Sequence, residues 1–459
     1  MTDGIPTPAR YFAVLSISAG SLLLMIDASI ASVALPTISE ALHVPASQTV
    51  LVLTLYQLVL AMTIIPFSAL GDHVGQRRLY RAGLVIYVLS AFLCLLATGL
   101  SVILAIRTVQ ALSSAAAFSV TFGLIRSTYP ARLLGRGLGI NTLFSASGNA
   151  LAPALGGLIL SIASWRWVFV AGVPLALVSL LAGRNLPDVR VEKKRFDAFG
   201  AALCASAFAL VILGLEAISH SADLPKPLLL LGAGVVTAYV FVNHQRRQRD
   251  PVLPLDLLTR PAFALAVSGS LMGAVASATI LFSLPFRLHE HGFSPAETGA
   301  MITPYAIASL MIAPASGILS DHVSPKLLGM CGLVVATLAM LLIAFMPAHP
   351  EYWDIVWRVW LCGAGFAMFL APNSRIVLAS TPADRAAAGG GLMTTSRMLG
   401  NALAATLVGC LLAIGHGPGP APALIAVGLA VVAMLCNLLQ PYDGTAAGAT
   451  AATKRAAEG

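Results

Sequence analysis

The apolar residues of this chain gather into runs of about 20, and these runs fix the environment in which it can fold. A helix needs about 20 residues to cross the hydrocarbon core of a bilayer. Of the 459 residues, 58% are hydrophobic and only 10% are charged, whereas soluble domains carry about 25% charged residues. The composition predicts an all-α integral membrane protein that crosses the bilayer many times, and it excludes a soluble enzyme.

Apolar runs of this length occur fourteen times, and each predicts a membrane-spanning helix. The first run is too long for the apolar core of a signal peptide, so we expect it to be retained. The predicted spans are 11–35, 49–70, 79–98, 101–125, 137–161, 165–182, 198–217, 228–242, 262–288, 296–319, 327–346, 355–379, 386–414 and 421–439.

The 27 Lys and Arg residues indicate how the spans are oriented. Alternate loops with the adjoining span ends, together with the two termini, hold 21 of them, the opposite loops and span ends hold 3, and 3 lie deeper inside spans. Because cytoplasmic loops are enriched in Lys and Arg, both termini are predicted to be cytoplasmic. The net charge of +8 belongs to these loops and does not indicate a nucleic-acid partner.

The two halves of the chain repeat one another. The string GNALA stands at 148–152 and again at 400–404, and DHV stands at 72–74 and again at 321–323. These matches keep their order and nearly the same offset, which chance would seldom produce. Parallel repeats of this kind are typical of transporters whose substrate site lies between the halves, near the middle of the membrane.

The repeat divides the chain into four predicted parts. Two of the fourteen spans have no counterpart in either repeat and lie between them, so we expect them to pack outside a core of six plus six helices. The C-terminal tail is small and polar, and we expect it to be disordered and cytoplasmic. The parts are an N-terminal six-helix bundle at 11–187, an inserted helix pair with basic cytoplasmic linkers at 188–260, a C-terminal six-helix bundle at 261–440, and the tail at 441–459.

An acidic residue, Asp27, lies in the middle of the first predicted span. An ionisable group at that depth costs about 2.5–3.5 kcal/mol on insertion scales. Its simplest use is to bind and release a proton, or to bind a cation, in a transport pathway. Arg107 in the fourth span needs an anionic or carbonyl partner. Alternatively, Asp27 is satisfied by a neighbouring helix without a coupling role, and Arg107 only bridges helices.

The loop after the second span reads GDHVGQRR at 71–78. A glycine suits the sharp reversal between two spans. Asp72 can face the N-terminus of a helix in the other half, where the helix dipole favours an anion, and the glycine-rich segment 389–391 is a candidate. Such a contact would latch the cytoplasmic side, while the alternative is a solvated turn. The residues predicted to form this conformational gate are Gly71, Asp72, Gly75, Arg77 and Arg78.

The fifth span contains GNALAPALGG at 148–157. Small residues allow close approach of helices, and Pro153 frees a backbone carbonyl and bends the helix. Ordinary helix packing is the alternative interpretation of this segment. The residues of interest in it are Gly148, Pro153, Gly156 and Gly157.

Four segments together resemble the major facilitator superfamily and, within it, the fourteen-helix drug:proton antiporter branch. The loop at 71–78 resembles G-x-x-x-D-x-x-G-R-R/K, and RTVQ at 107–110 resembles R-x-x-Q-G, with Ala111 in place of Gly. The segment 148–157 is similar to the antiporter motif G-x-x-x-G-P-x-x-G-G, and DASIASVALP at 27–36 is similar to the branch motif L-D-x-T-I-V-N-V-A-L-P. The resemblance implies a major facilitator fold, export rather than uptake, and proton coupling by Asp27 with Arg107.

Several polar and aromatic residues within the spans are candidates for lining a substrate cavity, although packing is the commoner role of such residues. All nine histidines fall in loops or at span ends, so we expect no metal site. No cofactor is expected, and the chain has no nucleotide-binding loop, which leaves an ion gradient as the energy source. The cavity candidates are Tyr56, Gln57, Phe118, Phe122, Asn141, Tyr305, Asn373 and Arg397.

The predicted function is that of a proton-coupled secondary active exporter, an antiporter of drugs or other lipophilic small molecules that works by alternating access. We expect a monomer in the bacterial inner (plasma) membrane, whose partners are substrate, proton and the lipid bilayer. A dedicated exporter of one endogenous metabolite is the alternative. Lipophilic cations are the common cargo of the branch that the chain resembles. The interiors of the spans hold three Arg against two acids, so neutral or anionic cargo remains an alternative. No catalytic constellation indicates an enzyme.

Overall fold

A computed structural model describes residues 5–130, 134–187, 197–220, 225–247, 255–320, 322–347, 350–381 and 386–441. Every regular element of these residues is a helix. The first half comprises α1 (Thr7–Leu42), α2 (Ala46–Thr49), α3 (Leu51–Val74), α4 (Gln76–Leu93), α5 (Leu100–Ser119), α6 (Thr121–Thr128), α7 (Leu134–Ile162) and α8 (Val173–Ala182), with 3₁₀ turns η1 (Cys94–Leu96), η3 (Trp165–Val170) and η4 (Gly183–Asn185).

The second half has the same all-helical character. The elements from residue 198 onward are α9 (Ala198–His220), α10 (Pro225–Arg247), the 3₁₀ turn η5 (Leu255–Thr259), α11 (Pro261–Glu290), α12 (Pro295–Leu319), α13 (Pro325–Ala344), α14 (Tyr352–Ala379), α15 (Ala386–Ala413) and α16 (Ala421–Leu439).

Twelve helices among the described residues are long and apolar enough to cross a membrane. The two remaining predicted spans coincide with α7 and α9, of which only the shorter apolar stretches Leu151–Ile162 and Ala202–Val211 qualify by composition. The chain is therefore a multi-pass helical membrane protein with twelve candidate spans, and the count of fourteen stays a prediction. The linkers at 188–196 and 248–254 and most of the predicted tail lie outside the described residues.

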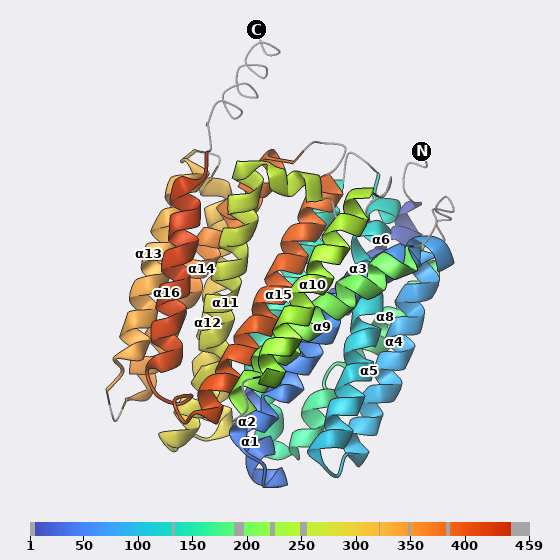
Figure 1. The fold of residues 1–459 in the computed structure, drawn as a ribbon. Helices are drawn as coiled ribbons and strands as arrows, with labels where there is room; N and C mark the ends of the chain where they lie inside the picture. The colour runs from blue at the N-terminus through green and yellow to red at the C-terminus, as the bar shows by residue number, and fades with distance from the viewer. Residues whose placement is uncertain are drawn as a thin grey trace.

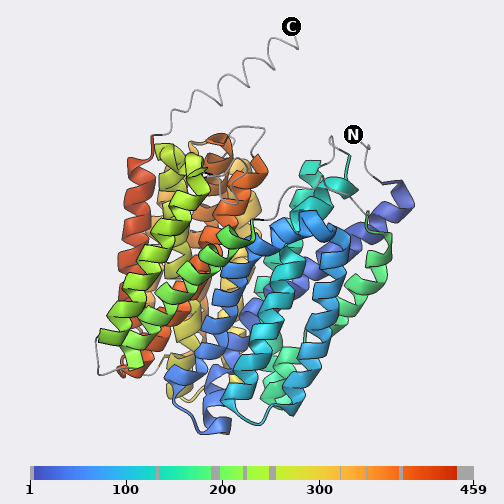
Figure 2. The same cartoon turned by 45° about the vertical axis from the view of Figure 1, so that its right-hand side comes forward.

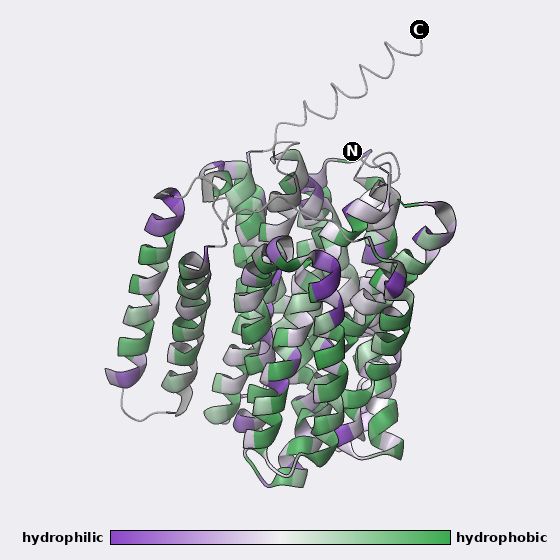
Figure 3. Ribbon diagram, turned by 90° about the vertical axis from the view of Figure 1, so that its right-hand side faces the viewer, coloured by the Kyte–Doolittle hydropathy of each residue, from purple (hydrophilic) through white to green (hydrophobic). Residues whose placement is uncertain are grey.

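Large apolar side chains remain exposed on the outward faces of the helices. Leu96, Leu229, Phe345 and Trp353 are each more than 70% exposed, and apolar residues cover the long helices in Figure 3. A soluble protein seldom leaves so much apolar surface uncovered. Lipid is the solvent that such a surface fits, because each helix satisfies its backbone hydrogen bonds internally.

The helices pack in two groups (Figures 1 and 2). In the first group, α1 packs against α7 and α8, and α5 packs against α3 and α4. In the second, α14 packs against α12 and α13, and α11 packs against α15 and α16. The groups meet where α7 contacts α12, where α3 and α2 contact α15, and where α1 contacts α11.

The helix α9 lies along the junction of the two groups. It packs against α10 and also contacts α3 from the first group and α15 from the second (Figure 1). Several apolar side chains of α10, among them Leu229, Val235 and Tyr239, are strongly exposed. The pair is therefore peripheral, with α9 as its inner member.

The helices α1 and α16 place both ends of the described chain at one end of the molecule, which we call the terminal end (Figure 2). The opposite end, where α1 finishes and α11 finishes, is called the distal end. Because helices of each group alternate in direction, α15 runs from the terminal end to the distal end. These two names are used below to give depth along the bundle.

Candidate functional site

The most deeply buried charges of the first group form an ion pair between α1 and α5. Nη1 of Arg107 lies 2.9 Å from Oδ1 of Asp27, and the two side chains are 0% and 1% exposed. Nη2 of Arg107 also donates to the backbone carbonyl of Asp27 at 3.3 Å. The two residues that sequence analysis singled out separately are thus brought together. Removing one partner of a buried pair typically costs about 3–5 kcal/mol, because the other charge is left uncompensated.

Two further helices contribute side chains around this pair. The Tyr87 hydroxyl of α4 donates to Oδ1 of Asp27 at 3.2 Å, and Gln110 accepts a hydrogen bond from Nη1 of Arg107 at 2.9 Å. The guanidinium of Arg107 lies 4.0 Å from the ring centroid of Tyr56 on α3, an arrangement that stabilises a cation. Tyr87 and Gln110 were not predicted individually, although the R-x-x-Q resemblance had included Gln110.

One carboxylate oxygen of Asp27 is left over. Oδ2 makes no hydrogen bond of regular geometry with a described residue, and neither does the buried Tyr56 hydroxyl. The Tyr56 hydroxyl is nevertheless close enough to Asp27 to interact with it electrostatically. A buried acceptor without a partner is costly, so Oδ2 is the atom of this ion pair with unused hydrogen-bonding capacity.

The small residues of α7 bring it into close contact with both groups of helices. A Cβ on Gly148 would lie 2.7 Å from the Leu22 carbonyl of α1, and one on Gly156 would lie 3.2 Å from the Ile30 carbonyl. On the other side, a Cβ on Gly157 would lie 2.8 Å from the Pro295 carbonyl of α12. Thus α7 joins the helix that carries Asp27 to the second group.

The loop at 71–78 turns sharply at Gly75, whose φ of 107° is available to glycine at low cost. Arg77 donates from Nη2 to the Arg184 carbonyl at 2.7 Å, which ties the loop to η4 in the same group. Gly71 packs against Val120, and Arg78 is exposed. The Asp72 side chain lies outside the described part of the structure, so its predicted contact with 389–391 stays a prediction.

A cross-group contact that sequence analysis missed lies at the distal end. Nε2 of His289 on α11 is 3.0 Å from Oε1 of Glu40 on α1, and both side chains are partly exposed. The two positions are 249 residues apart, the same offset that relates DHV at 72–74 to DHV at 321–323. The offset marks them as equivalent positions of the repeat, but equivalence alone does not indicate that two residues touch.

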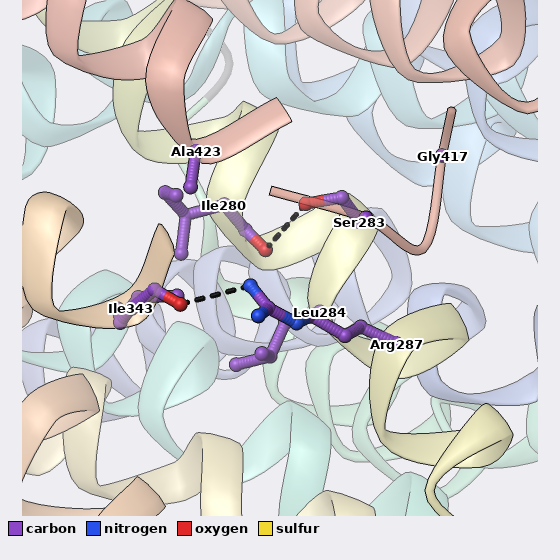
Figure 4. A pocket seen from close by; sticks show the side chains of 8 residues that line it. Ile280, Ser283, Leu284, Arg287, Ile343, Gly417 and Ala423 are labelled. Atoms are coloured by element: carbon purple, nitrogen blue, oxygen red, sulfur yellow. Dashed lines mark hydrogen bonds between the residues drawn. The ribbon is translucent and has the colours of Figure 1, made fainter. Parts of the chain in front are cut away.

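Among its described residues, the second group holds no copy of the buried ion pair. Ala276, which is 0% exposed, stands 249 residues after Asp27. Arg358, the counterpart of Arg107, pairs instead with Asp354 in its own helix at 2.5 Å. Arg287 donates to the Ile343 carbonyl at 2.8 Å and lines a small distal pocket (Figure 4). The charge chemistry of the two halves is therefore asymmetric.

The eight cavity candidates differ in how far their side chains are buried. Five of them are buried, namely Tyr56, Gln57, Phe118, Asn141 and Asn373. Phe122 and Arg397 are exposed, and Tyr305 is intermediate.

Three of the buried candidates have polar partners within the protein. Gln57 donates to the Ala28 carbonyl at 3.4 Å, and Asn373 donates to the Ala266 carbonyl at 3.0 Å. Asn141 accepts a hydrogen bond from Ser21 at 2.5 Å. Their polar groups therefore already contribute to helix packing.

The sequence profile of the Major Facilitator Superfamily matches residues 17–405 and 265–456, which together span most of the chain. The chain belongs to the major facilitator superfamily. It is 37% identical to the uncharacterized transporter YebQ of Escherichia coli K12 over 95% of this chain and 96% of that protein. The superfamily is one of transporters and not of enzymes.

More distant relatives carry names that state a cargo. The riboflavin transporter RibZ of Clostridioides difficile is 26% identical over 86% of each chain. The multidrug resistance protein Stp of Mycobacterium tuberculosis is 29% identical over 86% of this chain and 74% of that protein. A solved bacterial homologue of the human lysosomal transporter Spinster shares the fold, with a TM-score of 0.68, 16% identity, and coverage of 95% of this chain and 97% of that one.

Proposed function

We propose that this transporter is a proton-coupled secondary active exporter of drugs or other lipophilic small molecules in the bacterial inner membrane. The observation that carries the proposal is the buried Asp27–Arg107 pair, because it is a titratable group at membrane depth with one oxygen left for a proton. The relative named for multidrug resistance supports this class of cargo. We place the terminal end in the cytoplasm on the basis of the Lys and Arg distribution.

In the proposed cycle, Asp27 alternates between an ionised and a neutral state. Ionised, it is held by Arg107 and Tyr87. A proton at Oδ2 removes the Coulomb attraction between Arg107 and Asp27. Arg107 then keeps its contacts to Gln110 and to the Tyr56 ring, but it is held less strongly to α1. Because α7 packs on α1 and on α12, a shift of α1 reaches the interface between the two groups.

The free energy available from one proton is sufficient for export. A proton returning across about 180 mV releases about 4 kcal/mol, at about 2.3 kcal/mol per 100 mV. Each tenfold concentration ratio of a neutral compound requires about 1.4 kcal/mol. One proton per molecule therefore supports a gradient of roughly a thousandfold.

The finer architecture belongs to the same proposal. We take α7 and α9 to be membrane spans, which gives fourteen, with α9 and α10 as a pair inserted between two six-helix bundles. The peripheral position of α10 and the contacts of α9 with α3 and α15 support this division. We further propose that the chain acts as a monomer and that Gly71, Asp72, Gly75, Arg77 and Arg78 form a cytoplasmic gate.

The second candidate function is dedicated export of one endogenous metabolite. It is favoured by the similarity to a protein named as a riboflavin transporter. Expression in an efflux-deficient host, followed by a panel of dyes, antibiotics and metabolites, separates the two. Protection against several unrelated compounds supports multidrug export, whereas movement of a single compound class supports the alternative.

The test of proton coupling compares two aspartates, Asp27 and Asp354. Each pairs with an arginine, and the two arginines, Arg107 and Arg358, match one another in the repeat. Inverted vesicles with matched protein content are energised, and collapse of the pH gradient on substrate addition is measured. Asp27→Asn should reduce the substrate-induced proton flux at least about tenfold, because it removes the titrating group. The control Asp354→Asn removes the pair with Arg358, which forms within a single helix, and should retain most of the flux. Normal flux in well-expressed Asp27→Asn would refute proton coupling at this site.

A further inference from the structure

The side chain of Arg397 is exposed although it lies in the middle of α15. It makes no ion pair with a described residue, and the one electrostatic neighbour found for it in the described part of the chain is Tyr305 of α12. The 249-to-252 residue offset between the halves places it opposite Ser145, so the first half has no equivalent cation. An unpaired cation at membrane depth is costly unless it faces water and meets a ligand.

The neighbours of Arg397 along α15 show where its side chain points. Ser396 donates to the Val267 carbonyl of α11, and Met398 packs in an apolar cluster with residues of α3. Leu399, on the far side, packs together with Phe208 of α9 against a cluster of Leu58 of α3 and Ala402. At about 100° per residue, Arg397 falls between the α11 and α3 sides and opposite the α9 side. It therefore points toward the space between the two groups of helices.

The same face of α15 is closed further along. Ala404 and Val408 lie two and three turns beyond Arg397 toward the distal end, and both are fully buried in a cluster with Val50 and Leu53 of the first group. At 1.5 Å per residue, Ala404 is about 10 Å from Arg397 along the axis. The face of α15 that carries Arg397 is thus packed against the first group toward the distal end and is exposed at Arg397 itself.

Two hydroxyl groups within electrostatic range of Arg397 are suited to an anion. The Tyr305 hydroxyl bonds to the Ser277 hydroxyl of α11. Because only one of the two O–H groups is used between them, the other remains free to donate. Guanidinium binds carboxylates through two parallel hydrogen bonds. A carboxylate bound to Arg397 would therefore pair with a bidentate cation, and a hydroxyl donor would lie within electrostatic range of it.

We propose that Arg397, with Tyr305 and Ser277, is a subsite for a carboxylate, so that the transported compounds include amphiphilic carboxylic acids. This assignment names the substrate class of the export function proposed above and rests on it for the direction of transport. The exposed cation disfavours binding of cationic drugs at the same place. Export of a monoanion in exchange for one entering proton would carry two charges inward, whereas exchange of a monocation would carry none.

Binding to the purified full-length protein tests the substrate class without requiring transport. The probes are sets of matched acid, amide and amine on naphthyl, indolyl and biphenyl scaffolds, for example 2-naphthylacetate, its amide and 2-naphthylethylammonium. The wild type should bind the acids at least about tenfold more tightly than the amides or amines. Arg397→Gln should remove that preference and leave amide affinity within about twofold, because the side chain is exposed and not part of the packed interior.

Three further variants keep the test decisive. Arg397→Lys retains the charge but not the fork, and should keep a reduced preference. Tyr305→Phe should lower the affinity for the acids by about threefold and leave the affinities for the amides and amines unchanged. This variant reports on the site even if Arg397→Gln does not fold. Arg358→Gln, an arginine already paired with Asp354, should leave the acid preference unchanged. No acid preference on any scaffold, or a preference that survives Arg397→Gln, overturns the proposal.

The result is separable from that of the proton-coupling test. Asp27→Asn should keep the acid preference, because Asp27 and Arg397 lie in different groups of helices. Acid preference without substrate-induced proton flux would remove the proton antiport and retain the carboxylate subsite. Proton flux that does not depend on an acid group in the substrate would retain the proton antiport and remove the carboxylate subsite.

Discussion

At the scale of single residues, the shape of Arg107 matters as much as its charge. Its Nη1 reaches both Asp27 and Gln110, its Nη2 reaches the Asp27 carbonyl, and its flat face stacks on Tyr56. Lysine carries the charge on a single nitrogen and has neither a fork nor a planar face. The site therefore requires directed hydrogen bonds that only guanidinium offers together.

This geometry predicts the effect of a charge-conserving substitution. Arg107→Lys should lower substrate-induced proton flux about tenfold or more while the protein still inserts, since the charge remains but the contacts to Asp27 and Gln110 cannot be kept at once. The same exchange at Arg358, the corresponding position of the repeat, should change the flux less than about twofold. Purified protein yield, melting temperature and vesicle proton flux are measured for both. Equal losses at the two positions would show that the enclosed geometry is not special.

The residues of the buried pair could be found from the sequence, but the pairing pattern could not. A charge inside an apolar run is visible in the sequence, and so Asp27 and Arg107 stood out. Which helix faces turn toward each other depends on rotation about the helix axis, which no run of residues specifies. Arg358 illustrates the difference, because it matches Arg107 in the repeat yet pairs within its own helix. Arg397 was likewise named as a cavity candidate from the sequence, but the side of α15 on which it is exposed could not be predicted.

At the scale of elements, α7 is fixed by small residues on opposite faces. Gly148 and Gly156 lie against α1, whereas Gly157 lies against α12 across the interface. The sequence predicted close packing from this motif, and the structure adds that the packing has two partners. The element therefore has the contacts needed to connect movement of α1 to movement of the second group.

A bulky residue at the cross-interface position should break that connection. Gly157→Val places side-chain atoms where the Pro295 carbonyl and Gly299 now lie, and overpacking of this kind costs about 1–3 kcal/mol. We expect a lower melting temperature and a several-fold lower transport rate. Gly428→Val is the matched control, because no atom lies within 4 Å of a Cβ on that residue of α16. If both variants transport normally, the contact of α7 with α12 has no part in the cycle.

At the scale of the whole molecule, the distal closure combines apolar packing with one cross-group polar contact. Ala404 and Val408 pack against the first group, and Glu40 meets His289 at the rim. Because both side chains of the polar contact are partly exposed, it contributes only about 0.2–1 kcal/mol. The apolar contacts therefore dominate the closed distal end, and the polar contact tunes it.

Because the apolar contacts dominate, loss of the polar contact should shift the conformational equilibrium only slightly toward an open distal end. Glu40→Gln should raise the population of conformers that are open at the distal end by less than about fivefold, as expected for a loss of at most about 1 kcal/mol. Spin labels at His43 and Gly292 would report the opening as a longer distance. Val408→Asp, which inserts a charge into the apolar contact, should open the distal end much further. A larger effect from Glu40→Gln than from Val408→Asp would reverse the assignment.

The peripheral pair α9 and α10 bears on the molecule as a whole, because α9 touches one helix of each group. The central pair Asp27–Arg107 lies in α1 and α5, and neither helix is among those that α9 contacts most. We therefore expect the pair to restrain how far the groups separate and to take no part in proton transfer. Glu216→Gln, in α9, should leave substrate-induced proton flux mostly intact, in contrast to Asp27→Asn measured side by side in vesicles of matched protein content. Equal loss of proton flux in both variants would show that α9 belongs to the coupling pathway, and the division into two six-helix bundles with an inserted pair would have to be redrawn.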